Sequence, residues 1–183
     1  MSQVIALAGR RIDAPQAKQP RFPLEQAGVV EQRLSRLFQE VKASALVCSA
    51  CCGADLIALQ VAGAQKLRRR IVLPFAPEQF RQTSVTDRPD ERWGALFDRT
   101  LAEVQTAGEL VVLSDPGDDA QAYAAANVTI LQEAQALCSS QPGTTALAVI
   151  VWDGLSRGED DATEAFARLA RSSGIPVHEV LTF

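Results

Sequence analysis

Short runs of consecutive apolar residues alternate along the chain with segments in which apolar residues recur every three or four positions. The runs are Val4–Ala8, Ala45–Cys48, Ile71–Phe75, Leu110–Leu113, Ala146–Trp152 and Val177–Leu181. Continuous apolar runs of this length are typical of parallel strands that are covered on both faces. They therefore predict about six buried strands.

The segments between the runs carry helical periodicity. It predicts helices over 30–41, 54–67, 92–104, 123–137 and 162–170, and leaves 76–91 as a loop. Strands that alternate with helices form right-handed crossovers, which place helices on both faces of a parallel sheet. The predicted fold class is α/β: one three-layer, doubly wound Rossmann-like domain over residues 1–183, with a mostly parallel sheet of about six strands.

Composition narrows the possible functions. The 183 residues are 47% apolar, which excludes wholesale disorder, and no apolar run approaches the roughly 18 residues of a membrane helix. With 18 basic and 22 acidic residues the net charge is -4. That balance gives no reason to expect non-specific binding to nucleic acid or to a membrane. The one basic cluster, at 66–70, is expected to be a solvated helix end.

The four cysteines and the N-terminus suggest a reduced, cytoplasmic protein. Cys48, Cys51 and Cys52 have the spacing of a redox or zinc motif, but the other candidate ligands, Cys138 and His178, lack paired spacing. We expect small residues at a tight turn here, with a redox pair as the alternative, and predict no metal and no cofactor. The N-terminus has no basic leader, so we expect no signal peptide.

In open α/β sheets ligands bind beyond the carboxyl ends of the strands, so the loops after the strands hold the candidate site. After the first strand, Gly9 would let a ligand approach the backbone, and Arg10 and Arg11 would supply cations for a phosphate. The alternative is a glycine turn with two solvated arginines. The dinucleotide fingerprint GxGxxG is absent.

The second loop is a run of small residues that leads into a helix. Small side chains expose backbone N–H groups, and a helix N-terminus adds partial positive charge, so the loop predicts an anion site. Its candidate residues are Ser49, Gly53, Ala54 and Asp55. Asp55 would repel a phosphate, and a ribose hydroxyl is its expected partner. The alternative is plain packing of a helix against a strand.

Aromatic and amide side chains supply further candidates. Phe80, together with Trp93 and Phe97, would stack on a base at the edge of the sheet, or would simply pack in the core. Tyr123 and Asn127 lie four apart on one helix face. A buried amide needs hydrogen-bond partners, which either a ligand or a loop would supply.

A second glycine-containing loop follows the fifth strand and again leads into a helix. Its candidate residues are Asp153, Gly154, Gly158 and Thr163. Its acidic run does not suit a bare triphosphate. It suits ribose hydroxyls, or a cation held by carboxylates.

Together these segments resemble the SLOG superfamily, in its prokaryotic standalone type. The resemblance runs from about Val4 to Val180, and its motifs are ALAGRR, CSACCGADLIAL, VLPF to FD, AYAAAN and VWDG to DAT. The superfamily includes the LOG enzymes, the DNA-processing protein DprA and the sensor domains of TRPM channels. The resemblance implies a Rossmann-like fold that binds a nucleotide or nucleotide sugar, with Gly9-Arg10, Ser49–Asp55 and Gly158–Thr163 around the phosphate and ribose.

The LOG enzymes carry the motif PGGxGTxxE, from which this chain departs. Thr163 matches the threonine, but acids replace the glycines and Phe166 stands in place of the glutamate. Glu164 is displaced by two residues, about 200° around a helix. The prediction is a sensor for an adenine nucleotide such as ADP-ribose or a cyclic derivative. The alternative is a nucleotide N-glycosidase that releases a free base from a nucleoside monophosphate, with Asp55, Asp161 and Glu164 as catalytic candidates.

A sensor needs an output. We expect either a homodimer, since SLOG relatives often dimerise, or a separate effector protein. A third possibility is an interaction protein that kept the fold and lost its ligand. In that case aspartate at Gly9 or Gly53 would leave its effect unchanged.

Overall fold

The structure is a computed structural model that describes residues 1–114 and 118–183. Six strands form one sheet in the order β4-β3-β2-β1-β5-β6, and all neighbours are parallel. The strands are β1 (Ser2–Gly9), β2 (Ala43–Cys48), β3 (Arg68–Leu73), β4 (Leu110–Val112), β5 (Thr144–Trp152) and β6 (Val177–Leu181). The six predicted strands are confirmed, in a sheet that is wholly rather than mostly parallel.

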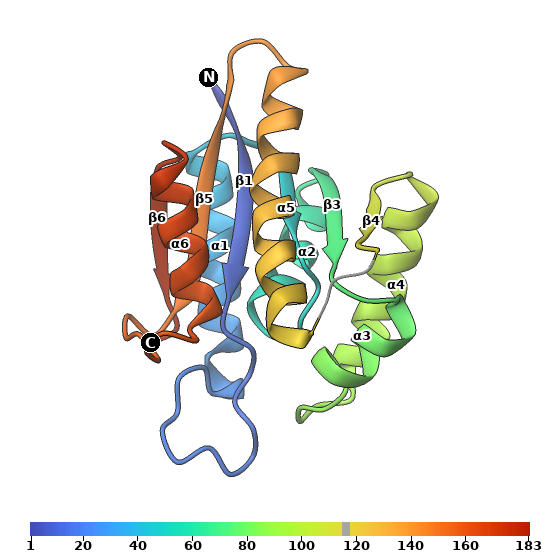
Figure 1. The fold of residues 1–183 in the computed structure, drawn as a ribbon, viewed down its shortest axis with the longest axis vertical. Coiled ribbons are helices and arrows are strands. Elements are labelled where there is room, and N and C mark those ends of the chain that lie inside the picture. Colours follow the sequence, from blue (N-terminus) through green and yellow to red (C-terminus); the bar gives the residue numbers. More distant parts are fainter. Residues whose placement is uncertain (115–117) are drawn as a thin grey trace.

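Helices cover both faces of the sheet (Figure 1). They are α1 (Ala27–Glu40), entered through the short 3-10 helix η1 (Leu24–Gln26), α2 (Ala54–Ala64), α3 (Pro77–Ser84), α4 (Arg92–Thr106), α5 (Asp119–Ser139) and α6 (Ala162–Ser172). One buried cluster joins the sheet to α1, α2 and α4, and a second joins it to α5 and α6. The three-layer α/β fold class is therefore confirmed.

The strand order reverses direction at one place. From β1 to β4 each new strand is added on the same side, after which α5 crosses the sheet and β5 pairs with β1. The loops after β1 and β5 therefore leave toward opposite faces. The crevice between such loops is where open α/β sheets bind ligands. In Figure 1 the loop after β1 extends beyond the carboxyl ends of the strands, at the bottom of the view.

Two local predictions were wrong. The segment after β3 contains α3, which begins with Pro77 at its first turn, where a proline needs no N–H. Only Phe80 and Ser84 of α3 are buried, so its eight residues carry too little periodicity to be seen. The basic cluster is likewise no solvated helix end. Arg68–Arg70 open β3, and the Nε atoms of Arg68 and Arg70 donate to Glu109, each at 2.6 Å.

Within the described residues, no helix is both long enough and apolar enough to cross a membrane.

Candidate functional site

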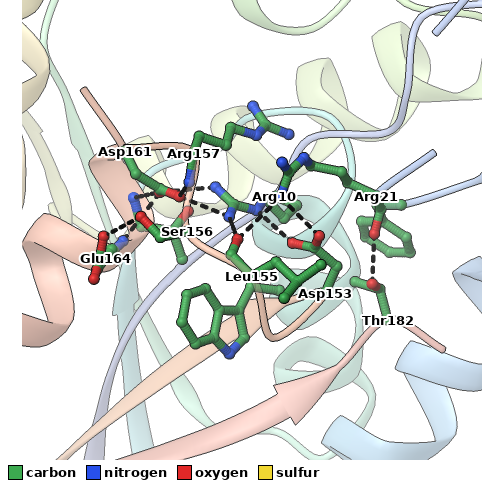
Figure 2. Close-up of polar contacts among 12 residues, drawn as sticks. Arg10, Arg21, Asp153, Leu155, Ser156, Arg157, Asp161, Glu164 and Thr182 are labelled. Atoms are coloured by element: carbon green, nitrogen blue, oxygen red, sulfur yellow. Dashed lines mark hydrogen bonds and ion pairs between the residues drawn. The ribbon is translucent and has the colours of Figure 1, made fainter. Parts of the chain in front are cut away.

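Arg10 lies buried at the centre of the crevice between the loops that follow β1 and β5. It exposes 3% of its surface, and its Nη1 and Nη2 each lie 2.7 Å from an oxygen of Asp161. Nε donates to Asp153 at 3.2 Å, and Nη2 also donates to the Leu155 carbonyl at 2.8 Å (Figure 2). The guanidinium also lies over the Trp152 ring, 5.8 Å from its centroid. The prediction that Arg10 offers a cation to a phosphate is corrected, because its charge is neutralised within the protein.

Both carboxylate oxygens of Asp161 accept hydrogen bonds from the protein. Besides Arg10, its carboxylate accepts from the backbone N–H groups of Arg157, Thr163 and Glu164 at 2.8–3.1 Å, and thereby caps the start of α6. The hydrogen bonds from Arg10 and from the backbone outweigh burial and lower the pKa of Asp161 to about 2. A carboxylate held in this way is a poor proton carrier, so the structure speaks against Asp161 as a catalytic acid or base.

Two other acids, Asp153 in the loop after β5 and Glu164 in the first turn of α6, are also held by the protein. Asp153 accepts from both Arg10 and Arg21, the latter at 2.8 Å. Glu164 accepts from the Ser156 hydroxyl and pairs with Arg168 at 3.4 Å. Glu164 lines neither of the cavities described below. It is therefore not placed as a catalytic residue, as its displacement from the LOG motif suggested.

The loop after β2 packs against the loop after β1, and this contact explains both glycines. A Cβ on Gly9 would lie 2.4 Å from the Cβ of Ala54, and a Cβ on Gly53, whose φ is 105°, would lie 2.7 Å from the Ile12 nitrogen. The Ala54 N–H donates to the Arg10 carbonyl at 3.1 Å. The start of α2 is therefore covered by the chain itself. The open anion cradle predicted there, with Gly53 and Ala54 around a phosphate, is corrected to a packing contact.

A cavity of about 520 Å³ opens beside these loops, and we call it the outer cavity. Its volume falls within the 300–1,000 Å³ typical of small-molecule sites. Five arginines and three aspartates line it: Arg10, Arg11, Arg21, Arg88, Arg157, Asp13, Asp160 and Asp161. They come from the loops after β1, α3 and β5. The basic residues therefore outnumber the acidic ones in a protein whose net charge is negative.

The arginines of the outer cavity differ in how they are paired. Arg10 and Arg21 hold Asp153 and Asp161. Arg11 pairs with Asp87, which also lies 4.0 Å from Arg88. Within the described residues no carboxylate pairs with Arg157, whose guanidinium extends away from Asp161 (Figure 2). Burial and the positive charges of Arg10 and Arg21 lower the pKa of Arg157. The Nε atoms of Arg11 and Arg88 are buried and have no partner in this part of the chain.

A smaller cavity of about 80 Å³ adjoins the outer one, and we call it the inner cavity. The two share the lining residues Gly9, Cys51, Tyr123, Ala162 and Thr163. The inner cavity is further lined by Leu7, Ala8, Ser49, Asp55, Ala126, Asn127 and Ile130. Tyr123 bonds to the Ser84 hydroxyl at 2.6 Å, and Asn127 donates to the Ala162 carbonyl at 3.0 Å. The Nδ2 group of Asn127 is thus bound by the protein itself, at the first residue of α6.

Asp55 differs from every other acid of the site. It exposes 5% of its surface, and one carboxylate oxygen, Oδ2, accepts from the Cys51 N–H at 3.2 Å. The other, Oδ1, is buried without a hydrogen-bond partner among the described residues. Burial dominates and raises the pKa of Asp55 to about 7. Perturbed carboxyl groups of this kind cluster at functional sites.

The structure brings together part of the predicted site. Residues that line one or both cavities are Gly9, Arg10, Arg11, Ser49, Asp55, Tyr123, Asn127, Asp161 and Thr163. Residues that line neither are Gly53, Ala54, Phe80, Asp153, Gly154, Gly158 and Glu164. Phe80 is fully buried and stacks on Phe97 with ring centroids 6.1 Å apart, so of the two alternatives it packs in the core and does not stack on a base.

Sequence reasoning missed several lining residues, above all Arg21, Arg88 and Arg157. Arg21 is held by a turn in which Asp13 accepts from the N–H groups of Arg21 and Phe22 at 2.8 and 2.9 Å. The available signal was one arginine in each of three glycine- or proline-bearing loops. No motif linked these loops to one another.

The cysteines of the second loop are free thiols. Burial raises the pKa of Cys48 and of Cys51, which disfavours the reactive thiolate. No group of three His, Cys, Asp or Glu side chains able to hold a metal occurs in residues 1–114 and 118–183.

Neither a known protein family nor a curated protein sequence matches the chain. Among solved structures, DNA processing protein A (DprA) from Streptococcus pneumoniae is similar with a TM-score of 0.53 and 15% identity. That match covers 97% of this chain, which spans half (50%) of that protein. At this identity the similarity shows the Rossmann-like fold alone.

Two further structures match less well. S. aureus MnaA, in a co-structure with UDP, gives a TM-score of 0.39 at 11% identity, over 100% of this chain and 69% of that one. UDP-GlcNAc 2-epimerase from Neisseria meningitidis, bound to UDP-GlcNAc, gives a TM-score of 0.35 at 11% identity, over 85% of this chain and 53% of that one.

Proposed function

We propose that the protein binds a nucleotide or nucleotide sugar in the outer cavity and acts as a sensor module of the SLOG superfamily. The observation that carries this proposal is the convergence of five arginines from three loops on one cavity at the point where the strand order reverses. Arg157 contributes a positive charge without a carboxylate partner in the described residues. Guanidinium groups are well suited to phosphate oxygens.

The phosphate would lie near Arg157 and Arg88. Arg10 and Asp161 form the rigid floor that positions the Arg157 backbone, since Asp161 accepts from the Arg157 N–H at 2.8 Å. Adenine nucleotides such as ADP-ribose or a cyclic derivative are the class we favour. The sequence resemblance to the SLOG superfamily supports that choice, and the fold similarity to DprA is compatible with it.

The same site also supports a second candidate, hydrolysis of the N-glycosidic bond of a nucleoside monophosphate. The observation that favours it is Asp55, because an acid with a pKa of about 7 can accept a proton from water near neutral pH. Asp161 and Glu164 drop out of this scheme for the reasons given above. Asp55 alone would then act as general base, and Asp55→Asn would abolish the release of free base.

Thermal unfolding of the purified protein with AMP, ADP, NAD, ADP-ribose and cyclic ADP-ribose tests the proposal. A ligand at 100 times its Kd adds about 2.7 kcal/mol, which raises the Tm of a domain of this size by about 5–10 °C. No shift with any of these compounds would contradict nucleotide binding.

Chromatography with mass detection, after incubation with the same compounds, separates the two candidates. An intact nucleotide retained on the protein supports the sensor. Free base in solution supports the hydrolase.

A sensor would pass its signal to a second copy of the chain or to a separate effector protein. Light scattering with and without the retained nucleotide tests the first route. A change in mass on binding would support it, and an unchanged monomer would leave the effector as the route.

A further inference from the structure

Two residues that line the inner cavity, Asp55 and Ser49, each carry a polar atom that the fold leaves without a partner. Asp55 Oδ1 and Ser49 Oγ are both buried, and neither has a hydrogen-bond partner in the described residues. The other Asp55 oxygen is held by the Cys51 N–H, which fixes the carboxylate in place. Burial of polar atoms without partners costs stability, so a bound molecule that supplies partners would be favoured there.

The walls of the inner cavity limit what such a molecule can be. Leu7, Ala8, Ala126 and Ile130 are apolar, and none of the arginines of the outer cavity lines the inner one. A phosphate would meet the Asp55 carboxyl group with no arginine in the cavity wall. The volume of about 80 Å³ is also too small for a whole nucleotide. The cavity suits a small neutral group that carries hydrogen-bond donors.

We propose that the inner cavity receives ribose hydroxyl groups of the bound nucleotide, with Asp55 Oδ1 as acceptor and Ser49 Oγ as a second partner. The inference rests on the proposed function, because it requires the phosphate to lie in the outer cavity. Shared lining residues such as Tyr123 and Thr163 allow one molecule to reach both cavities. The ligand is then oriented with its anionic end toward Arg157 and its sugar toward α2.

Calorimetric titration with ADP, 2′-deoxy-ADP, 3′-deoxy-ADP and inorganic pyrophosphate tests this orientation. Asp55→Asn is expected to weaken ADP binding roughly 10- to 100-fold, the effect of losing hydrogen bonds to a charged group. Ser49→Ala is expected to weaken it about 3- to 10-fold. Pyrophosphate, which has no sugar, is expected to bind all three proteins equally. At least one deoxy analogue should bind the wild type more weakly than ADP, and Asp55→Asn should lose that discrimination.

Asp98→Asn is the matched control, because Asp98 is an exposed acid on α4 that lines neither cavity. Equal binding of ADP and both deoxy analogues, with Asp55→Asn unchanged, would overturn the inference and leave the proposed function intact. Weaker pyrophosphate binding by Asp55→Asn would also overturn it, since Asp55 would then act through the fold. A wild-type protein that binds neither these probes nor ADP-ribose would overturn the proposed function and the inference with it.

Discussion

The guanidinium of Arg10 and the carboxylate of Asp161 form a bidentate ion pair, with both N–O distances at 2.7 Å and side-chain exposures of 3% and 0%. The two residues are separated by 151 positions in the sequence. Their pair joins the end of β1 to the start of α6, across the point where the strand order reverses. The crevice therefore has a fixed floor before any ligand arrives.

Breaking this pair is expected to be costly. Arg10→Ala leaves the buried charge of Asp161 without its partner, and such substitutions typically lower the free energy of unfolding by about 3–5 kcal/mol. Urea unfolding at pH 7 measures the loss. The control is Arg168→Ala, which breaks an exposed pair with Glu164 at 3.4 Å and should cost less than about 1 kcal/mol. Similar losses for the two variants would contradict the account of Arg10.

The same pair predicts a loss of stability in acid. The pKa of Asp161 is lowered to about 2 in the folded protein, below its ordinary value of 3.8. The ionised Asp161 carboxylate therefore adds about 2 kcal/mol to the free energy of unfolding above about pH 4. This contribution is lost as the pH falls through 2. Asp161→Asn should be less stable than the wild type at pH 6, and the difference should shrink toward pH 2. A difference that stays constant with pH would argue against an ionised Asp161.

Asp55 is expected to have the opposite effect on stability. Its pKa rises from 3.8 to about 7 in the folded protein, which therefore binds a proton that the unfolded chain releases. The bound proton therefore adds up to roughly 4 kcal/mol to the free energy of unfolding. This contribution is fully present below about pH 4 and is lost as the pH rises through 7. Asp55→Asn removes the charge, so it should be more stable than the wild type at pH 8. Urea unfolding at pH 4, 6 and 8 measures how the free energy of unfolding changes with pH in the wild type and in Asp55→Asn.

Two results would count against this account of Asp55. One is a pH dependence of unfolding that is identical in the wild type and Asp55→Asn. The other is a variant that is less stable at pH 8, since the ionised carboxylate would then be stabilised by its surroundings.

Two glycines with different surroundings test the packing of the first loop. Gly9→Ala places a methyl group 2.4 Å from the Ala54 Cβ and 2.9 Å from the Val151 carbonyl oxygen, so it should destabilise the fold by about 1–3 kcal/mol or more. Gly28→Ala on α1 meets no atom within 4 Å and should stabilise it by about 0.5–1 kcal/mol. Thermal unfolding measures both. If Gly9→Ala is as stable as Gly28→Ala, the close approach of the two loops is wrong.

Because both glycines are packed this closely, replacing Gly9 or Gly53 with aspartate would not test ligand binding alone. Both substitutions would disturb the fold itself. They would therefore not separate a protein that lost its ligand from one that still binds it. Arg157→Ala is the cleaner test, since that side chain has no carboxylate partner in the described residues.

The sheet could be predicted from the sequence because its signal is local. Each buried strand is a continuous apolar run, and the predicted strands lie within about three residues of β1 to β6. The missed α3 has just two buried residues, Phe80 and Ser84. A helix that buries so few side chains shows no detectable helical periodicity in its apolar residues.

The candidate site could be predicted only in part, because pairing between distant residues leaves no local signal. Gly9, Ser49 and Asp55 were found because they follow strands that end at the same edge. Arg10 was found as well, but its pairing with Asp161 was not. Arg88 and Arg157 lie in separate loops of a chain with net charge -4, so their convergence could not be read from composition.

Titration of the wild type, Arg157→Ala and Arg168→Ala with ADP-ribose and inorganic pyrophosphate, at low and high salt, tests the central claim most directly. Arg168 is an exposed arginine of α6 that lines neither cavity, so it is the matched control. We expect the wild type and Arg168→Ala to bind equally, Arg157→Ala to bind about tenfold more weakly or worse, and high salt to weaken binding. Binding that is unchanged by Arg157→Ala, or absent from the wild type, would contradict a phosphate site in the outer cavity.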